Sequence, residues 1–209
     1  MTDKKIIVTA VILASILIAG GWYYSKKNPP VASITDSAAD QIKSWEAGIT
    51  YGNPSAPLTV EEYTNFLCPA CATAAANILP QLEEDYVKSG RVKIVFFIYP
   101  PFELSRAALC AQEQEKFIQY HDYLFSHQKQ ITEEKDIKDF AVNAGLDEVK
   151  FNECYDSDKF NDLIDKWYKE GQKRGIDSTP TFIIGGQKII GAQPYAEIKK
   201  VIDEKLSQL

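Results

Sequence analysis

The first apolar segment of the chain is long and carries no charge. Residues 6–24 read IIVTAVILASILIAGGWYY, close to the roughly 20 residues that a helix needs to cross a bilayer. Two lysines precede the segment, and Trp22, Tyr23 and Tyr24 end it, as expected of amphipathic rings at a membrane-water boundary. The pattern predicts a transmembrane signal-anchor behind a short cytoplasmic tail, together residues 1–24.

A cleaved signal peptide is the alternative interpretation, because the small residues at 19–21 offer a cleavage site. Bulky aromatics and lysines come directly after them, and the apolar run is long for a signal peptide, so we favour an uncleaved anchor. Both interpretations export the C-terminal part of the chain, since the short tail before the span cannot fold. We therefore expect a single-pass cell-membrane protein whose C-terminal domain lies on the extracytoplasmic side.

The polar segment after this span has the composition of a stem. Residues 25–48 contain a Pro-Pro pair and are rich in Ser, Ala and Asp, which favours a linker. Within it, Ile42 and Trp45 are candidates for docking on the folded domain. The remainder, residues 49–209, is long enough for one domain with a substantial core.

Hydrophobic periodicity alternates along the first half of this domain. APLTVEEYTNF has the two-residue repeat of a strand, with Leu58 and Val60 on one face. A helix is predicted from Pro69 to Gly90, with a kink at Pro80. RVKIVFFIYPP then has the β-branched and aromatic content of a buried strand.

The second half of the domain begins with a helical block. The period is helical from about 103 to 171, which predicts an all-helical insert. Strands at 181–184 and 188–190 flank a Gly-Gly pair typical of a tight hairpin, and a helix is predicted at 195–206. The order predicts an α/β fold in which helices cover both faces of a small mixed sheet.

Charge limits the kinds of partner. The formal net charge is −6, and without the first 30 residues the chain keeps 19 basic and 28 acidic residues, a net of −9. An acidic exported domain argues against nucleic acid or anionic lipid as its partner.

Candidate chemistry lies at the junction of the first strand and helix, in FLCPACAT. Cys68 is expected at the helix N-terminus, where free N-H groups and the helix dipole stabilise a thiolate. Cys71, one turn inside, is expected to be shielded. This asymmetry predicts dithiol-disulfide exchange, in which Cys68 reacts with a partner sulfur and Cys71 resolves the mixed disulfide.

A structural zinc site is the alternative for a Cys-x-x-Cys pair, and it needs two further ligands. The sequence does not offer them, because Cys110 and Cys154 stand alone and His121 and His127 are not closely spaced. Both histidines are expected at surface positions of a helix. We therefore predict a redox pair, with no metal and no other cofactor.

Four stretches carry a family resemblance: GNPSAPLTVEEYTNFLCPACATAAANILPQLEEDYVKSGRVKIVFFIYP, ALCAQEQEKFIQYHDYLF, GLDEVKFNECYDSDKF and GIDSTPTFIIGGQKIIGAQP. In this order they resemble the DsbA-like thioredoxin family of thiol-disulfide oxidoreductases, from about Gly52 to the C-terminus. The resemblance implies a thioredoxin fold with an inserted helical subdomain. It also implies disulfide exchange outside the cytoplasm.

The resemblance assigns roles to three further residues. Thr179-Pro180 matches the family's cis-proline loop, which faces the two cysteines and leaves the Thr179 backbone free for an extended substrate; from sequence alone a trans bond is the more common form. Glu62 matches the family's buried carboxylate, which exchanges a proton with the inner thiol. The adjacent Glu61 leaves the alternative that both acids belong to an exposed strand end.

The remaining cysteines, Cys110 and Cys154, are expected to form a structural disulfide, because an exported chain with an even cysteine count tends to pair them. Two buried free thiols are the alternative.

The direction of electron flow stays open on sequence grounds. The Pro69-Ala70 dipeptide and Asn65 depart from residues frequent in strongly oxidising members, which carry histidine and aspartate there. We expect a monomeric oxidase that acts on exported cysteine-containing proteins and is reoxidised by a membrane redox partner or a small oxidant. A reductase or isomerase on the same fold, and a non-catalytic peptide-binding module, are the alternatives.

Overall fold

The structure is a computed structural model, and it describes residues 43–209. The predicted anchor and Ile42 lie outside the described residues. No helix within residues 43–209 has the length and apolar character needed to cross a membrane. The folded unit comprises Ser44–Leu209.

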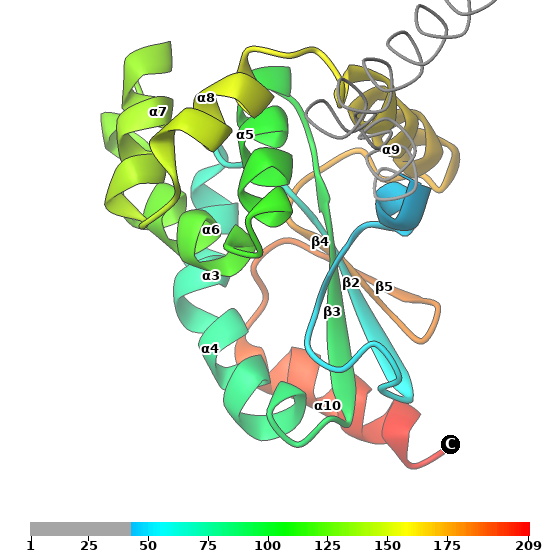
Figure 1. Ribbon diagram of the computed structural model, residues 1–209. Helices are drawn as coiled ribbons and strands as arrows, with labels where there is room; N and C mark the ends of the chain where they lie inside the picture. The colour runs from blue at the N-terminus through cyan, green and yellow to red at the C-terminus, as the bar shows by residue number, and fades with distance from the viewer. Residues whose placement is uncertain (1–42) are drawn as a thin grey trace, which may run out of the picture. The chain divides into compact units, whose positions relative to one another are not determined.

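In the described part of the chain, five strands form one mixed sheet in the order β1-β3-β2-β4-β5. β2 and β3 are parallel, and the other neighbouring pairs are antiparallel. The strands are β1 (Ile49–Tyr51), β2 (Leu58–Thr64), β3 (Val92–Ile98), β4 (Thr181–Ile184) and β5 (Gln187–Ile190). Figure 1 shows the sheet between α3 and α4 on one side and α9 on the other. The predicted mixed sheet with helices on both faces is confirmed.

The helix predicted after β2 is divided in the structure. It comprises α3 (Pro69–Asn77), α4 (Leu79–Leu82) and the π-helical turn η2 (Glu83–Val87). Pro80 lies in the first turn of α4, where its missing N-H costs little, whereas inside a continuous helix it would remove a hydrogen bond. α10 (Tyr195–Leu206) lies beside this segment, since the Tyr86 hydroxyl donates to the Asp203 carboxylate at 2.6 Å.

Five α-helices lie between β3 and β4 in the chain. Figure 1 shows α5, α6, α7 and α8 gathered at the end of the sheet where α3 begins. The bounds are α5 (Phe102–Glu113), α6 (Phe117–Ser126), the short turn η3 (Gln128–Gln130), α7 (Glu134–Asn143), α8 (Glu148–Tyr155) and α9 (Asn161–Lys173).

The segment expected as a linker includes residues that pack on the domain. The short helix η1 (Trp45–Ala47) lies against α9. The Trp167 indole donates to the Trp45 carbonyl at 3.1 Å, and the Trp45 ring lies 5.7 Å from that of Phe160.

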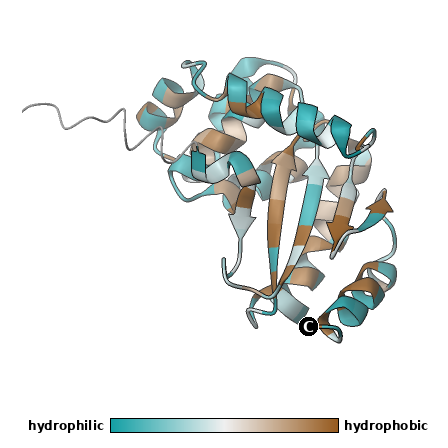
Figure 2. Ribbon diagram, turned by 90° about the vertical axis from the view of Figure 1, so that its right-hand side faces the viewer, coloured by the Kyte–Doolittle hydropathy of each residue, from teal (hydrophilic) through white to brown (hydrophobic). Residues whose placement is uncertain are grey.

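Successive side chains of each strand point to opposite faces of the sheet, so the core has two layers. On one face, Tyr63 and Phe97 stack with ring centroids 4.7 Å apart, and Phe97 contacts Trp167 of α9 edge-on. The other face carries Val60 and Phe182, both without exposed surface. Figure 2 shows the strands largely in hydrophobic colours and several of the outer helices largely in hydrophilic ones.

Candidate active site

The two cysteines of the Cys-x-x-Cys motif differ in burial as their positions predict. Cys68 is the N-cap of α3 in extended conformation, and Pro69 opens the helix. Cys68 is half-buried and Cys71 has no exposed surface; both are free thiols. Asn65 shapes the preceding turn, since its side-chain oxygen accepts from the Leu67 amide at 2.7 Å. The turn presents the Cys68 sulfur at the start of the helix.

The surroundings of the two sulfurs move their pKa values apart. Partial burial by itself would raise the pKa of Cys68, but hydrogen bonds from the Thr179 side chain, from the Cys71 and Ala70 amides and from the Cys71 thiol outweigh burial and lower it. Burial raises the pKa of Cys71 to about 12. The surroundings therefore make Cys68 the more readily ionised of the two thiols.

The loop before β4 faces Cys68. The Thr179-Pro180 peptide bond is cis, and the Cys68 thiol donates to the Thr179 carbonyl at 3.2 Å. Pro180 is buried. Within residues 43–209, no group of three His, Cys, Asp or Glu side chains is placed to hold a metal ion.

Glu62 is a carboxyl group inside the sheet core. It has no exposed surface, and neither carboxyl oxygen has a close hydrogen-bond partner within the described chain. Its partners on the neighbouring strands are Phe96 and Phe182, whose side chains lie on the same face of the sheet. Loss of hydration among these rings raises the pKa of Glu62 to about 8, although an interaction with the Thr64 hydroxyl opposes the shift.

Sequence reasoning did not identify Thr64. Its side chain is fully buried, and its hydroxyl interacts with both the Glu62 carboxyl and the Cys71 thiol. None of these contacts is a close hydrogen bond, because the Thr64 oxygen also has no partner at standard geometry among the described residues. Thr64 therefore lies close enough to influence the pKa of both the buried acid and the inner thiol. The alternation of side chains along a strand could have indicated Thr64, because it lies two residues after Glu62 and therefore on the same face of β2.

Gln128 was also missed, because it lies 60 residues from the motif. Its side-chain amide donates to the Phe66 carbonyl at 2.7 Å and to the Cys68 carbonyl at 2.9 Å. The helical insert therefore contacts the backbone that carries Cys68.

The expectation for His121 is wrong. His121 has no exposed surface, and its ring lies among the rings of Phe66, Phe96, Phe117 and Phe125. Tertiary packing places it in the core, although Asp122 on the surface contacts its Nδ1 at 2.8 Å. His127 is half-buried and stacks on Tyr123 with centroids 4.0 Å apart.

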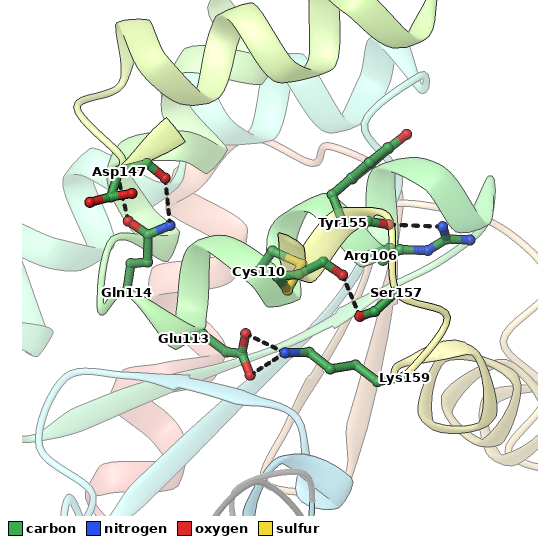
Figure 3. The surroundings of a disulfide bond; sticks show 9 residues. Arg106, Cys110, Glu113, Gln114, Asp147, Tyr155, Ser157 and Lys159 are labelled. Atoms are coloured by element: carbon green, nitrogen blue, oxygen red, sulfur yellow. Dashed lines mark hydrogen bonds and ion pairs between the residues drawn. A yellow bond between two sulfur atoms is a disulfide. The ribbon is translucent and has the colours of Figure 1, made fainter. Parts of the chain in front are cut away.

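Cys110 of α5 and Cys154 of α8 form a disulfide. Figure 3 shows polar contacts on both sides of it that join the same two parts of the insert. Arg106 donates to the Tyr155 carbonyl at 3.0 Å, and Lys159 pairs with Glu113 at 2.7 Å. The disulfide therefore joins two segments that already contact each other.

Removing this disulfide is expected to destabilise the protein without removing its active site. The bond joins residues separated by 44 positions, and loops of such length contribute about 2 to 4 kcal/mol through the entropy of the unfolded chain. The double substitution Cys110→Ala/Cys154→Ala should lower the free energy of unfolding by that amount in urea titration. Unchanged stability would contradict a structural role.

Comparison with known proteins places this geometry in a family. A thioredoxin family model matches residues 44–204. The chain belongs to the thioredoxin family. "Disulfide bond formation protein D" of Bacillus subtilis is 27% identical over 169 residues, covering 74% of this chain and 75% of that protein. "Probable disulfide bond formation protein D" of Bacillus anthracis is 27% identical over 170 residues, 75% and 77% of the two chains.

Solved structures share the fold. The crystal structure of oxidised BdbD from Bacillus subtilis has a TM-score of 0.67 and 26% identity, covering 78% of this chain and 95% of that chain. The crystal structure of Wolbachia pipientis alpha-DsbA1 has a TM-score of 0.69 and 20% identity, and the match covers 76% of this chain and 90% of that chain. At this identity it shows the shared fold. The resemblance to DsbA-like thiol-disulfide oxidoreductases is thereby confirmed.

Proposed function

We propose that this thioredoxin-family oxidoreductase introduces disulfides into exported proteins through Cys68 and Cys71. The main support for the oxidase over the reductase is the difference in pKa between the two thiols, because the pKa of Cys68 is lowered at the start of α3. A stabilised thiolate stabilises the reduced form of the pair, and so makes its disulfide the more oxidising. The relatives named for disulfide bond formation support this direction.

The reaction begins with the enzyme in the disulfide form. A substrate thiolate attacks the Cys68 sulfur, the Cys68–Cys71 bond breaks, and Cys71 leaves and takes a proton from Glu62. The substrate's second thiolate then attacks its own sulfur in the mixed disulfide and releases Cys68 as a thiolate. Two electrons pass from the substrate dithiol to the enzyme, and a membrane-bound or small disulfide-donating oxidant returns the enzyme to its starting state.

The substrate chain is held beside the nucleophile by the cis-proline loop. Because the Thr179 carbonyl faces Cys68, the backbone of this loop can pair with an extended segment next to the substrate cysteine. An unfolded polypeptide fits this mode, since its backbone groups are free.

The proposed location is the extracytoplasmic face of the cell membrane, with residues 1–24 as tail and anchor, 25–48 as stem and 49–209 as catalytic domain. An oxidising compartment is needed for the enzyme disulfide to persist.

Equilibration with glutathione buffers measures the reduction potential of the enzyme and so tests whether it acts as an oxidase or a reductase. We expect a reduction potential of about −180 mV or higher, in the range of enzymes that donate disulfides. The fraction of reduced enzyme would be measured by alkylation and mass spectrometry. A potential near that of thioredoxin, about −270 mV, would contradict the oxidase and favour the reductase on the same fold.

A further inference from the structure

An open cleft of about 590 Å³ begins at Thr179. Its walls come from four places: Asn65 before α3, the segment that joins β3 to α5, helix α9, and the residues that precede Pro180. Because the Thr179 carbonyl lies 3.2 Å from the Cys68 sulfur, the cleft opens beside the reactive atom. A polypeptide joined to Cys68 therefore has residues next to its cysteine within reach of the cleft.

Two tyrosines give the cleft an aromatic wall. Tyr99 and Tyr168 meet edge-on with ring centroids 5.3 Å apart. Tyr168 is 39% exposed, whereas Tyr99 is 7% exposed and its hydroxyl has no hydrogen-bond partner within the described chain. Gly171 allows α9 to approach this closely, since a Cβ there would lie 1.7 Å from the Tyr99 hydroxyl.

The charge of the lining has one sign. Asp165 and Asp177 line the cleft, and no lysine or arginine of residues 43–209 does. Asp165 pairs with Lys169 at 2.6 Å, but both side chains are substantially exposed, so the pair is weak and readily exchanged. Asp177 has no ion pair within the described part of the chain, and its carboxylate accepts only from the Ser178 hydroxyl, at 3.3 Å.

We propose that this cleft is a substrate subsite for a lysine or arginine side chain close to the reacting cysteine of an unfolded polypeptide. The proposal rests on the proposed function, because it assigns a preference to exchange at Cys68. A guanidinium group can stack on the exposed Tyr168 ring while it pairs with a carboxylate. The apolar stem of either basic side chain packs on the aromatic wall.

The test compares two peptides that differ only in charge. Each contains one cysteine, with arginine or its neutral analogue citrulline, which has a similar shape, two residues later. Rate constants for reaction with the oxidised full-length enzyme would be measured by quenching and mass spectrometry. The ratio of the arginine rate to the citrulline rate is then compared between enzyme variants, which cancels the intrinsic difference between the peptide thiols.

We expect the ratio to fall about 5-fold or more in Asp165→Asn/Asp177→Asn, as the loss of one or two partly exposed ion pairs implies. The matched control is Glu170→Gln, which removes one carboxylate from α9 outside the cleft lining and should keep the wild-type ratio. Asp177→Lys brings the lining to the same net charge as the double variant and should also lower the ratio.

Three outcomes would overturn the proposal. Equal ratios in the wild type and the double variant would show that the cleft does not bind the basic side chain. An equal fall in Glu170→Gln would assign the preference to net charge alone. If the citrulline peptide reacted no faster with the enzyme than with oxidised glutathione, exchange at Cys68 itself would fail, and the proposed function would fall with the subsite.

Discussion

Replacing Cys68 by serine is expected to abolish catalysed disulfide formation. The Cys68 sulfur is the half-buried, thiolate-forming atom at the N-terminus of α3, while Cys71 is fully buried and its pKa is raised to about 12 by burial. A serine hydroxyl has no accessible anion at neutral pH and forms no disulfide. Refolding of a reduced, cysteine-containing substrate with Cys68→Ser should therefore proceed at the rate seen without enzyme.

The matched variant is Cys71→Ala, which keeps the nucleophile and removes the resolving thiol. It should accumulate a mixed disulfide between Cys68 and a substrate protein, detectable on non-reducing gels and lost on reduction. Residual catalysis by Cys68→Ser would contradict the assignment of the nucleophile. A wild-type enzyme that gave no acceleration would contradict the enzymatic function and leave a peptide-binding module.

Replacing Glu62 by glutamine is expected to stabilise the protein at alkaline pH. Burial raises the pKa of Glu62 from 4.5 to about 8, so between these values the native protein holds a proton that the unfolded chain has released. Stability is therefore present in full below pH 4.5 and declines as the pH rises towards 8. At pH 8 the loss amounts to about 4 kcal/mol, and Glu62→Gln should avoid it.

Urea unfolding of the oxidised protein at several pH values measures this effect, because neither active-site sulfur titrates in that form. Wild type and Glu62→Gln should have similar free energies of unfolding at about pH 4 and differ most at about pH 8. The control Glu61→Gln changes the neighbouring acid, which is partly exposed and pairs with Arg174, and should not stabilise. A difference between wild type and Glu62→Gln that does not depend on pH would exclude a strongly raised pKa.

The same substitution should slow the chemistry. Cys71 must lose its proton as it attacks a mixed disulfide at Cys68, and the carboxylate form of Glu62, which is the minor form below about pH 8, is the base that accepts it in the reverse of the proton transfer proposed above. Release of glutathione from a Cys68-glutathione mixed disulfide should slow roughly 10²-fold in Glu62→Gln. Thr64→Val, which removes only the hydroxyl between the acid and the thiol, should slow it in the same direction. A variant that is both more stable and slower is the signature of a buried catalytic acid.

The sequence predicted the elements whose patterns are local. β2, β3 and the hairpin β4–β5 carry two-residue repeats or β-branched runs bounded by Gly and Pro, and α10 matches its predicted bounds. By contrast, β1 was missed, because it is three residues long and owes its strand conformation to pairing with β3. Short edge strands have too few residues for a periodic signal.

The site was predictable where one motif fixes position and chemistry together. The Cys68–Cys71 spacing at a predicted helix start gave the contrast in burial, and the family resemblance gave the buried position of Glu62. Gln128 and His121 were not predictable, because their environments depend on contacts with Phe66, which is distant in the sequence. Such contacts appear only once the helical insert is folded over the motif.

The central claim is that backbone amides at the start of α3 hold the Cys68 sulfur as a thiolate. Its most direct test is the rate of iodoacetamide alkylation of Cys68 in the reduced protein as a function of pH, measured by mass spectrometry. The rate should rise with a midpoint clearly below that of a free thiol, about 8.5. A midpoint at or above about 8.5 would contradict the claim.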